Sequence, residues 1–128
     1  MKTPADITPE MLAFLREYHL ASLTTMRTDG SPHVVPVGFS YDENAHVVRI
    51  ITFPASTKYK NAQRGGRAVV SQVDGGRWLT LEGTVSAVSD AERVGLAVAG
   101  YAARYRPPSE REDRVAIEIA VDRIMGRA

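Results

Sequence analysis

The feature of this sequence that most limits its fold is a series of short apolar segments separated by tight turns. Asp29-Gly30, Asp42-Glu43-Asn44 and Asp74-Gly75-Gly76 each stand between two such segments. Turns of this kind join neighbouring antiparallel strands, whereas parallel strands need a long crossover connection. The pattern therefore indicates an antiparallel sheet and not an alternating strand–helix fold.

The segments between the turns predict six β-strands. They are rich in β-branched and aromatic residues, which favour extended backbone. In the longest, Gly83 marks a bulge or a close approach of another backbone. In the last, apolar residues at every second position from Val115 to Val121 predict one buried and one solvated face. The predicted strands cover residues 20–27, 34–41, 46–53, 67–73, 77–88 and 115–124.

Three further segments carry the signals of helices. Thr8-Pro9-Glu10 is typical of a helix start, and the apolar spacing after it extends the helix to about residue 19. A short helix is predicted to begin at Ser56 or Thr57. Ser89-Asp90-Ala91-Glu92 resembles a capping box that opens a third helix, which Pro107-Pro108 must end. Together with the strands, these helices predict a mainly β antiparallel barrel with about three helices.

Length and composition limit the architecture and the function classes. A chain of 128 residues favours a single domain, residues 1–128, and the net charge of +1 gives no overall field toward nucleic acid or membrane. The absence of cysteine excludes disulfides, thiolate metal sites and cysteine catalysis. The three histidines lack metal-ligand spacing, so no metal is expected. Without a membrane-length apolar segment or a signal-peptide core, we expect a cytoplasmic protein.

Residues 51–61 form the segment most typical of a binding site. An apolar run ends at Pro54, and Ser56, Thr57 and Lys58 follow at the start of the short helix. Exposed backbone N–H groups, hydroxyls and an ammonium together suit a phosphate group. Asn61 lies on the same helix face as Lys58, three residues later. No nucleophile–base motif is present, so the catalytic residues are unknown and a bound phosphorylated cofactor is expected to supply the chemistry.

An ordered set of segments carries a family resemblance, from about residue 9 to residue 125. Residues 20–25, 29–37, 51–61 and 77–83 resemble the split β-barrel flavin and deazaflavin oxidoreductases related to pyridoxamine 5′-phosphate oxidase. Residues 33–39, 71–79 and 101–106 are most similar to the coenzyme F420-dependent biliverdin reductase group. The resemblance implies a six-stranded antiparallel split barrel with Greek-key connections.

The resemblance also implies a cofactor site and an oligomeric state. It implies a homodimer with two sites at the subunit interface, each holding coenzyme F420, or alternatively FMN. Thr57 stands where the oxidases carry an arginine before their phosphate-binding lysine, which disfavours FMN because one guanidinium is missing. The implied cofactor-binding residues are His33, Val34, Val35, Pro36, Val37, Ile51, Thr52, Ser56, Thr57, Lys58, Asn61, Arg77 and Trp78, with Trp78 contributed by the second subunit.

The resemblance implies a reductase that passes hydride from reduced F420 to a small unsaturated acceptor, such as biliverdin or another tetrapyrrole. Arg104 and Arg106 could hold an acidic tail of that acceptor, although helix-end arginines are more often structural. Two alternatives remain: an FMN-binding oxidoreductase, and a non-catalytic protein that binds flavin, haem or another tetrapyrrole. Neither nucleic acid nor membrane is an expected partner.

Overall fold

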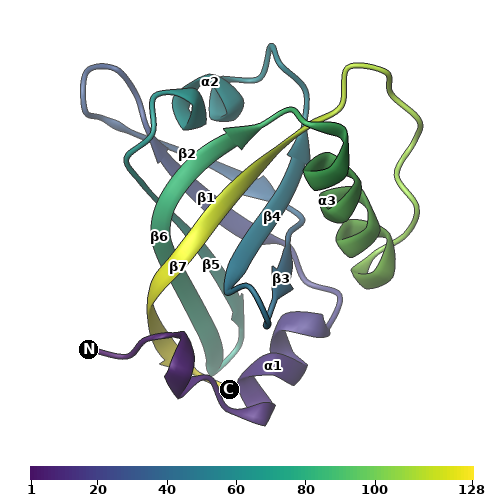
Figure 1. The fold of residues 1–128 in the computed structure, drawn as a ribbon. Coiled ribbons are helices and arrows are strands. Elements are labelled where there is room, and N and C mark those ends of the chain that lie inside the picture. Colours follow the sequence, from purple (N-terminus) through teal and green to yellow (C-terminus); the bar gives the residue numbers. More distant parts are fainter.

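The computed structural model describes residues 1–128 and shows one seven-stranded antiparallel sheet that curves strongly along its width (Figure 1). The strand order is β2-β1-β5-β6-β7-β4-β3. The strands are β1 Ala21–Met26, β2 Pro32–Val37, β3 Ser40–Asp42, β4 Val47–Thr52, β5 Arg67–Asp74, β6 Arg77–Val88 and β7 Val115–Arg127. The helices are the short 3-10 helix η1 Pro4–Asp6 and the α-helices α1 Pro9–Arg16, α2 Thr57–Gln63 and α3 Ala91–Arg104.

The mainly β antiparallel fold with three α-helices is confirmed, but the sheet has seven strands instead of the predicted six. The predicted strand 34–41 is divided at Gly38 and Phe39 into β2 and β3. β2 pairs with β1 and β3 pairs with β4, so these two residues carry the chain from one edge of the sheet to the other. The two edge strands do not pair with each other, so the barrel is not closed.

The short strand β3 leaves an open seam beside β4. β3 pairs only with Val47, Val48 and Arg49 of β4. The remainder of β4, from Ile50 to Thr52, pairs with β7 on its other side and has no strand partner toward β2. The seam therefore leaves this part of β4 without a neighbouring strand next to the end of β2.

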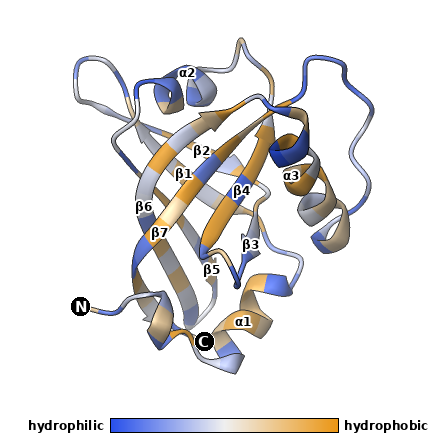
Figure 2. Ribbon diagram, in the orientation of Figure 1, coloured by the Kyte–Doolittle hydropathy of each residue, from blue (hydrophilic) through white to orange (hydrophobic).

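The core lies inside the curved sheet, and a helix lies at each end of it. α1 contributes Phe14 and Leu15 at one end, and α2 contributes Tyr59 and Ala62 at the other (Figure 1). Each buried leucine, isoleucine or phenylalanine contributes about 1.5–3 kcal/mol of hydrophobic stabilisation. In Figure 2 the hydrophobic residues follow the strands, and the loop after α3 is mainly hydrophilic. Among the helices, none has both the length and the hydropathy that a membrane-spanning helix requires.

The predicted alternation of buried and solvated residues is wrong for the first half of β7. Residues 115–119 are all buried, because α3 covers the outer face of the strand there. Ala116 packs in a small cluster with Val94 and Ala97 of α3. Glu118 is buried through ion pairs with arginines of β4 and α3.

The predicted irregularity at Gly83 is confirmed. The register between β6 and β7 shifts between Glu82 and Gly83, as in a β-bulge. A Cβ atom at Gly83 would lie 1.8 Å from the carbonyl oxygen of Ala120. Only glycine fits this approach of two backbones, so Gly83 lets β6 and β7 stay paired as they bend.

Candidate functional site

A cleft of about 720 Å³ opens at the seam between β2 and β4. The ends of these strands form one side, and the last turn of α3 and the loop after it form the other. Its lining is Pro36, Val37, Gly38, Ile50, Ile51, Thr52, Phe53, Lys58, Tyr101, Arg106, Pro107, Pro108, Ser109, Arg111 and Arg114.

The charges of the cleft lining are all positive. Lys58, Arg106, Arg111 and Arg114 line it, and no aspartate or glutamate does. The chain as a whole has a net charge of only +1, so this concentration of cations is local. A concave surface with charges of one sign attracts ligands of the opposite sign. The cleft is therefore suited to an anionic ligand, as the sequence around Lys58 predicted.

Lys58 is half-buried at the start of α2 and forms no hydrogen bond or ion pair within the chain. Burial lowers the pKa of its ammonium, because the charged form loses solvation there. An anion bound in the cleft would stabilise the charged ammonium of Lys58 in place of the lost water. This side chain is the best placed of the predicted phosphate-binding groups.

The loop after α3, residues 105–114, supplies the other three cations. The guanidinium of Arg111 lies 4.3 Å from the ring centroid of Phe53 and forms an ion pair with Asp113. Arg114 donates a hydrogen bond to the carbonyl oxygen of Ser109, which folds the loop back on itself. Arg106 is exposed and has no partner within the chain, so its donors are available to a ligand.

The other residues of the predicted phosphate corner form contacts within the protein. The Ser56 hydroxyl is buried, lies 2.8 Å from the Thr52 hydroxyl and accepts the N–H of Tyr59 as the N-cap of α2. Thr57 is exposed, outside the cleft lining.

Asn61 is also buried, and both ends of its side-chain amide form hydrogen bonds within the chain. Its Nδ2 donates to Thr25 Oγ1 at 3.0 Å, and its Oδ1 accepts a hydrogen bond from Arg64 at 2.7 Å. The side chain thus fixes α2 to β1 and does not face the cleft.

The predicted residues of β2 divide between the cleft and other surfaces. Pro36 and Val37 line the cleft, whereas Val34 is exposed on the outer face of the sheet. Val35 packs against the main core. His33 is partly buried, and its Nδ1 atom is buried without a hydrogen-bond partner. Neither His33 nor Val35 lines the cleft within one chain.

Arg77 and Trp78 lie at the opposite end of β6 from the cleft, next to the β5–β6 turn. Trp78 is half-buried and stands opposite Val73 and Arg127 in the sheet. Within a single chain, neither residue reaches the cleft.

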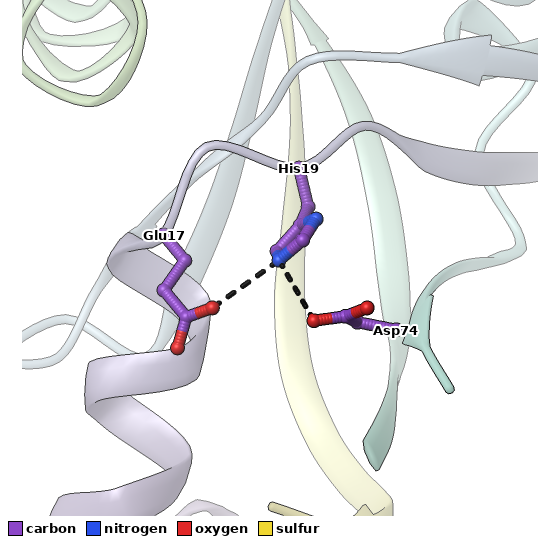
Figure 3. A group of neighbouring side chains, drawn as sticks. All are labelled: Glu17, His19 and Asp74. Atoms are coloured by element: carbon purple, nitrogen blue, oxygen red, sulfur yellow. Dashed lines mark hydrogen bonds and ion pairs between the residues drawn. The ribbon is translucent and has the colours of Figure 1, made fainter. Parts of the chain in front are cut away.

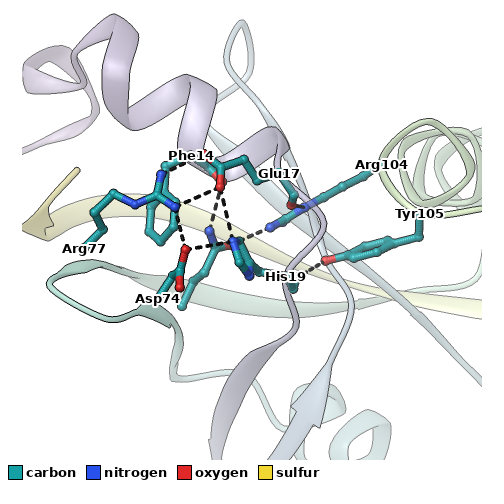
Figure 4. Close-up of polar contacts among 8 residues, drawn as sticks. Phe14, Glu17, His19, Asp74, Arg77, Arg104 and Tyr105 are labelled. Carbon is teal, nitrogen blue, oxygen red and sulfur yellow. Dashed lines mark hydrogen bonds and ion pairs between the residues drawn. The ribbon is translucent and has the colours of Figure 1, made fainter.

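Arg77 belongs to a polar cluster with Glu17, His19 and Asp74 (Figures 3 and 4). His19 Nε2 lies 3.2 Å from Glu17 Oε1 and 3.5 Å from Asp74 Oδ2. Arg77 Nη2 donates to the same two oxygens, at 2.9 and 2.6 Å, and its guanidinium lies over the Phe14 ring. Because the guanidinium occupies the side of these carboxylates that a metal ion would need, the cluster is an ion-pair network.

Arg104 and Arg106 were predicted together, but the structure separates them. Arg106 lines the cleft, whereas Arg104 is partly buried, and each of its three guanidinium nitrogens donates a hydrogen bond within the chain, to Glu17, Phe39 and Gln72. Arg104 therefore has a structural role within the chain and does not face a ligand in the cleft.

Several cleft residues were not identified from the sequence. Phe53, Tyr101, Arg111 and Arg114 line the cleft beside the predicted residues. No local sequence pattern indicates that the loop carrying Arg111 and Arg114 returns to the end of β4. Pro107-Pro108 was the one available signal, because it forces the chain to leave the helix axis at that point.

Comparisons with known proteins agree with the fold. A family described as pyridoxamine 5′-phosphate oxidase matches residues 7–127. An F420H2-dependent biliverdin reductase of Mycobacterium tuberculosis (strain CDC 1551 / Oshkosh) is 49% identical over 128 residues, 100% of this chain and 93% of that protein.

Two solved structures are similar to the whole chain. A conserved hypothetical protein from Mycobacterium tuberculosis aligns with a TM-score of 0.80 and 22% identity, over 99% of this chain and 89% of the other. A structure described as an F420 reductase aligns with a TM-score of 0.74 and 25% identity, over 93% of this chain and 98% of the other.

Proposed function

The chain belongs to the pyridoxamine 5′-phosphate oxidase family, and we propose that it is a reductase dependent on reduced coenzyme F420. The relative that is 49% identical over the whole chain has this cofactor dependence. The structural observation that carries the proposal is the cleft with four cationic side chains and no acidic one.

The chemistry of the cleft fits this cofactor. Coenzyme F420 has a flat ring system, a phosphate and a tail of glutamates, so it needs both apolar contacts and several cations. Pro36, Val37 and Ile51 offer apolar surface, and Lys58 offers an ammonium to the phosphate. The arginines of loop 105–114 then hold the carboxylates of the tail or of an acidic acceptor.

When bound, reduced F420 supplies a hydride, which together with a proton from water reduces an unsaturated acceptor. The protein's own contribution is to hold the ring and the acceptor in contact and to limit access of water. Val37, Ile51 and Phe53 supply the apolar contacts for this. We propose biliverdin or a similar tetrapyrrole as the acceptor, because the 49% identical relative is a biliverdin reductase. Arg106 is the free cation best placed for a propionate of such an acceptor.

We also propose that the functional form is a homodimer, in which Arg77 and Trp78 of one chain approach the cleft of the other. An exposed apolar surface on the outer face of β2, β1 and β5 supports this proposal. Leu20 is 59%, Val34 58% and Val73 67% exposed, which is unusual for neighbouring aliphatic side chains. Light scattering should give the mass of two chains, and the mass of one chain would reject the dimer.

Titration of the protein with F420, followed by the fluorescence of the cofactor, tests the proposed function. Lys58→Ala should weaken binding by about 1.5–3 kcal/mol if the ammonium contacts the phosphate. Lys60→Ala is the matched control, because Lys60 lies on the same helix but is exposed and outside the cleft. Equal affinities of the two variants would reject the role of Lys58.

Turnover distinguishes the remaining candidates. Reduction of biliverdin by the protein with reduced F420 would support the reductase. The second candidate is an FMN-binding oxidoreductase, which the family membership favours, and tight retention of FMN during purification would support it. Binding of F420, FMN or haem without turnover of any acceptor would instead indicate a non-catalytic binding protein.

A further inference from the structure

The last turn of α3 joins three separate parts of the chain through the Arg104 side chain. Its Nε donates to the carbonyl oxygen of Glu17 at 2.9 Å, and its Nη1 to that of Phe39 at 2.8 Å. Its Nη2 donates to Oε1 of Gln72, a side chain that is itself 1% exposed. Arg104 therefore ties α3 to the α1–β1 connection, the β2–β3 connection and β5.

The adjacent Tyr105 makes a second link to the same connections. Its hydroxyl donates to the carbonyl oxygen of His19 at 2.7 Å and accepts the backbone N–H of Phe39 at 3.2 Å. Burial raises the pKa of this phenol, so the hydroxyl keeps its proton and donates at neutral pH. The position of the ring is thus fixed at its polar end.

Tyr105 and its partner Phe39 each lie next in sequence to a residue of the cleft lining. Tyr105 precedes Arg106 on the loop side, and Phe39 follows Gly38 on the strand side. Gly38 itself is in close contact with the helix, since a Cβ atom there would lie 2.9 Å from Tyr101 Cε2 and 3.0 Å from Tyr105 Cε2. The width of the cleft between the loop and the strand end therefore depends on how the end of α3 packs against residues 38 and 39.

We propose that Arg104 and Tyr105 are positioning residues, which hold the loop that carries Arg106 against the β2–β3 connection and so set the affinity of the cleft for its anionic cofactor. The inference rests on the proposed function, because the cofactor is the probe of the cleft. It gives Arg104 a role that acts through Arg106 and the loop, without direct contact with the ligand.

The test compares two variants that disturb the contact between the end of α3 and residues 38 and 39, one on each side of it. Tyr105→Phe keeps the ring and removes the hydroxyl, and Gly38→Ala pushes a methyl group against Tyr101 and Tyr105. In Tyr105→Phe, we expect the dissociation constant for F420 to rise roughly 3- to 10-fold, the range of one lost neutral hydrogen bond. In Gly38→Ala, we expect the dissociation constant to rise as well, because the methyl group pushes the end of α3 away from residue 38. We also expect binding to depend less on salt, because a displaced loop cation no longer contributes to attraction of the ligand.

Tyr18→Phe is the matched control. Its hydroxyl has no partner and the side chain is 65% exposed, yet its ring touches that of Tyr105 at a centroid distance of 5.1 Å. This variant should bind F420 as the wild type does. All titrations are made below the unfolding temperature of each variant, which thermal unfolding establishes.

The outcomes separate the two proposals. A wild-type protein that does not bind F420 would overturn the proposed function and this inference with it. A wild type that binds, with an unchanged dissociation constant or an unchanged salt dependence in Tyr105→Phe and Gly38→Ala, would overturn only the inference. If the variants have a lower unfolding temperature but bind F420 as the wild type does, the contacts of Arg104 and Tyr105 serve stability alone and the inference is wrong.

Discussion

Arg77 and Glu17 form a two-pronged ion pair, in which Nη1 lies 2.7 Å from Oε2 and Nη2 lies 2.9 Å from Oε1. The pair joins the end of α1 to the start of β6, residues that are far apart in the sequence. Hydrogen bonding from Arg77 is the main reason that the pKa of Glu17 falls to about 2, from an ordinary value of 4.5. The carboxylate of Glu17 is thus stabilised in the folded chain.

This pKa predicts how stability responds to acid. Since the folded state lowers the pKa of Glu17, its contribution is present above about pH 4.5 and disappears as the pH falls toward 2. Glu17→Gln should therefore be less stable than the wild type at pH 7, and the difference should shrink between pH 4.5 and 2. Urea unfolding across this range measures it. Glu112→Gln, which removes an exposed and unpaired carboxylate, should show no such trend.

Replacing Gly83 by alanine should cause a large loss of folding stability, although it adds only one methyl group. In Gly83→Ala the new methyl group meets the backbone of Ala120, which cannot move without breaking the β6–β7 pairing. We expect unfolding free energy to fall by about 3 kcal/mol or more. Gly95→Ala is the control, because Gly95 lies within α3 with open space around it. That variant should gain about 0.5–1 kcal/mol, and a similar loss in both would contradict the role given to the bulge.

The ion pairs of Glu118 should contribute more to the unfolding free energy than the exposed ion pair of Asp122 does. It accepts hydrogen bonds from Arg93 at 2.5 Å and from Arg49 at 3.3 Å, and its side chain is 11% exposed. Glu118→Ala should lower the unfolding free energy by about 3 kcal/mol, because it leaves the largely buried guanidinium of Arg49 without this partner. Asp122→Ala removes an exposed partner of Arg67 on the same strand and should lose less than about 1 kcal/mol. Chemical denaturation of both variants tests the contrast.

The sequence predicted those parts of the fold that local signals encode. The hairpin of β5 and β6 follows from Asp74-Gly75-Gly76, a turn sequence between two apolar segments. The division of β2 from β3 was missed, because Gly38-Phe39 lies inside an apolar run and the change of partner strand is a long-range event. The cover that α3 gives to β7 was missed for the same reason. For α3 itself, the start was identified, but Asp90 is the N-cap in place of Ser89.

The candidate site was predictable only where its residues lie close in sequence. Ile51, Thr52 and Lys58 were found from one segment, and they do line the cleft. Arg104 and Arg106 looked equivalent in the sequence, yet one is directed into the protein and the other to the cleft. α3 ends at Arg104, and the chain leaves the helical conformation at Tyr105, so Arg106 belongs to the loop. The single domain, the homodimer and the cytoplasmic location stay predictions.

The strand order has a consequence for local opening of the molecule. β6 and β7 lie in the middle of the sheet and pair along almost their whole length, whereas β2 and β3 lie at its margins. β2 also contains Pro32 and Pro36, which have no amide hydrogen to donate. Deuterium uptake should therefore be slowest in β6 and β7 and faster in the edge strands β2 and β3. Transient opening of these edge strands would admit a bulky planar ligand while the central strand pairs stay intact.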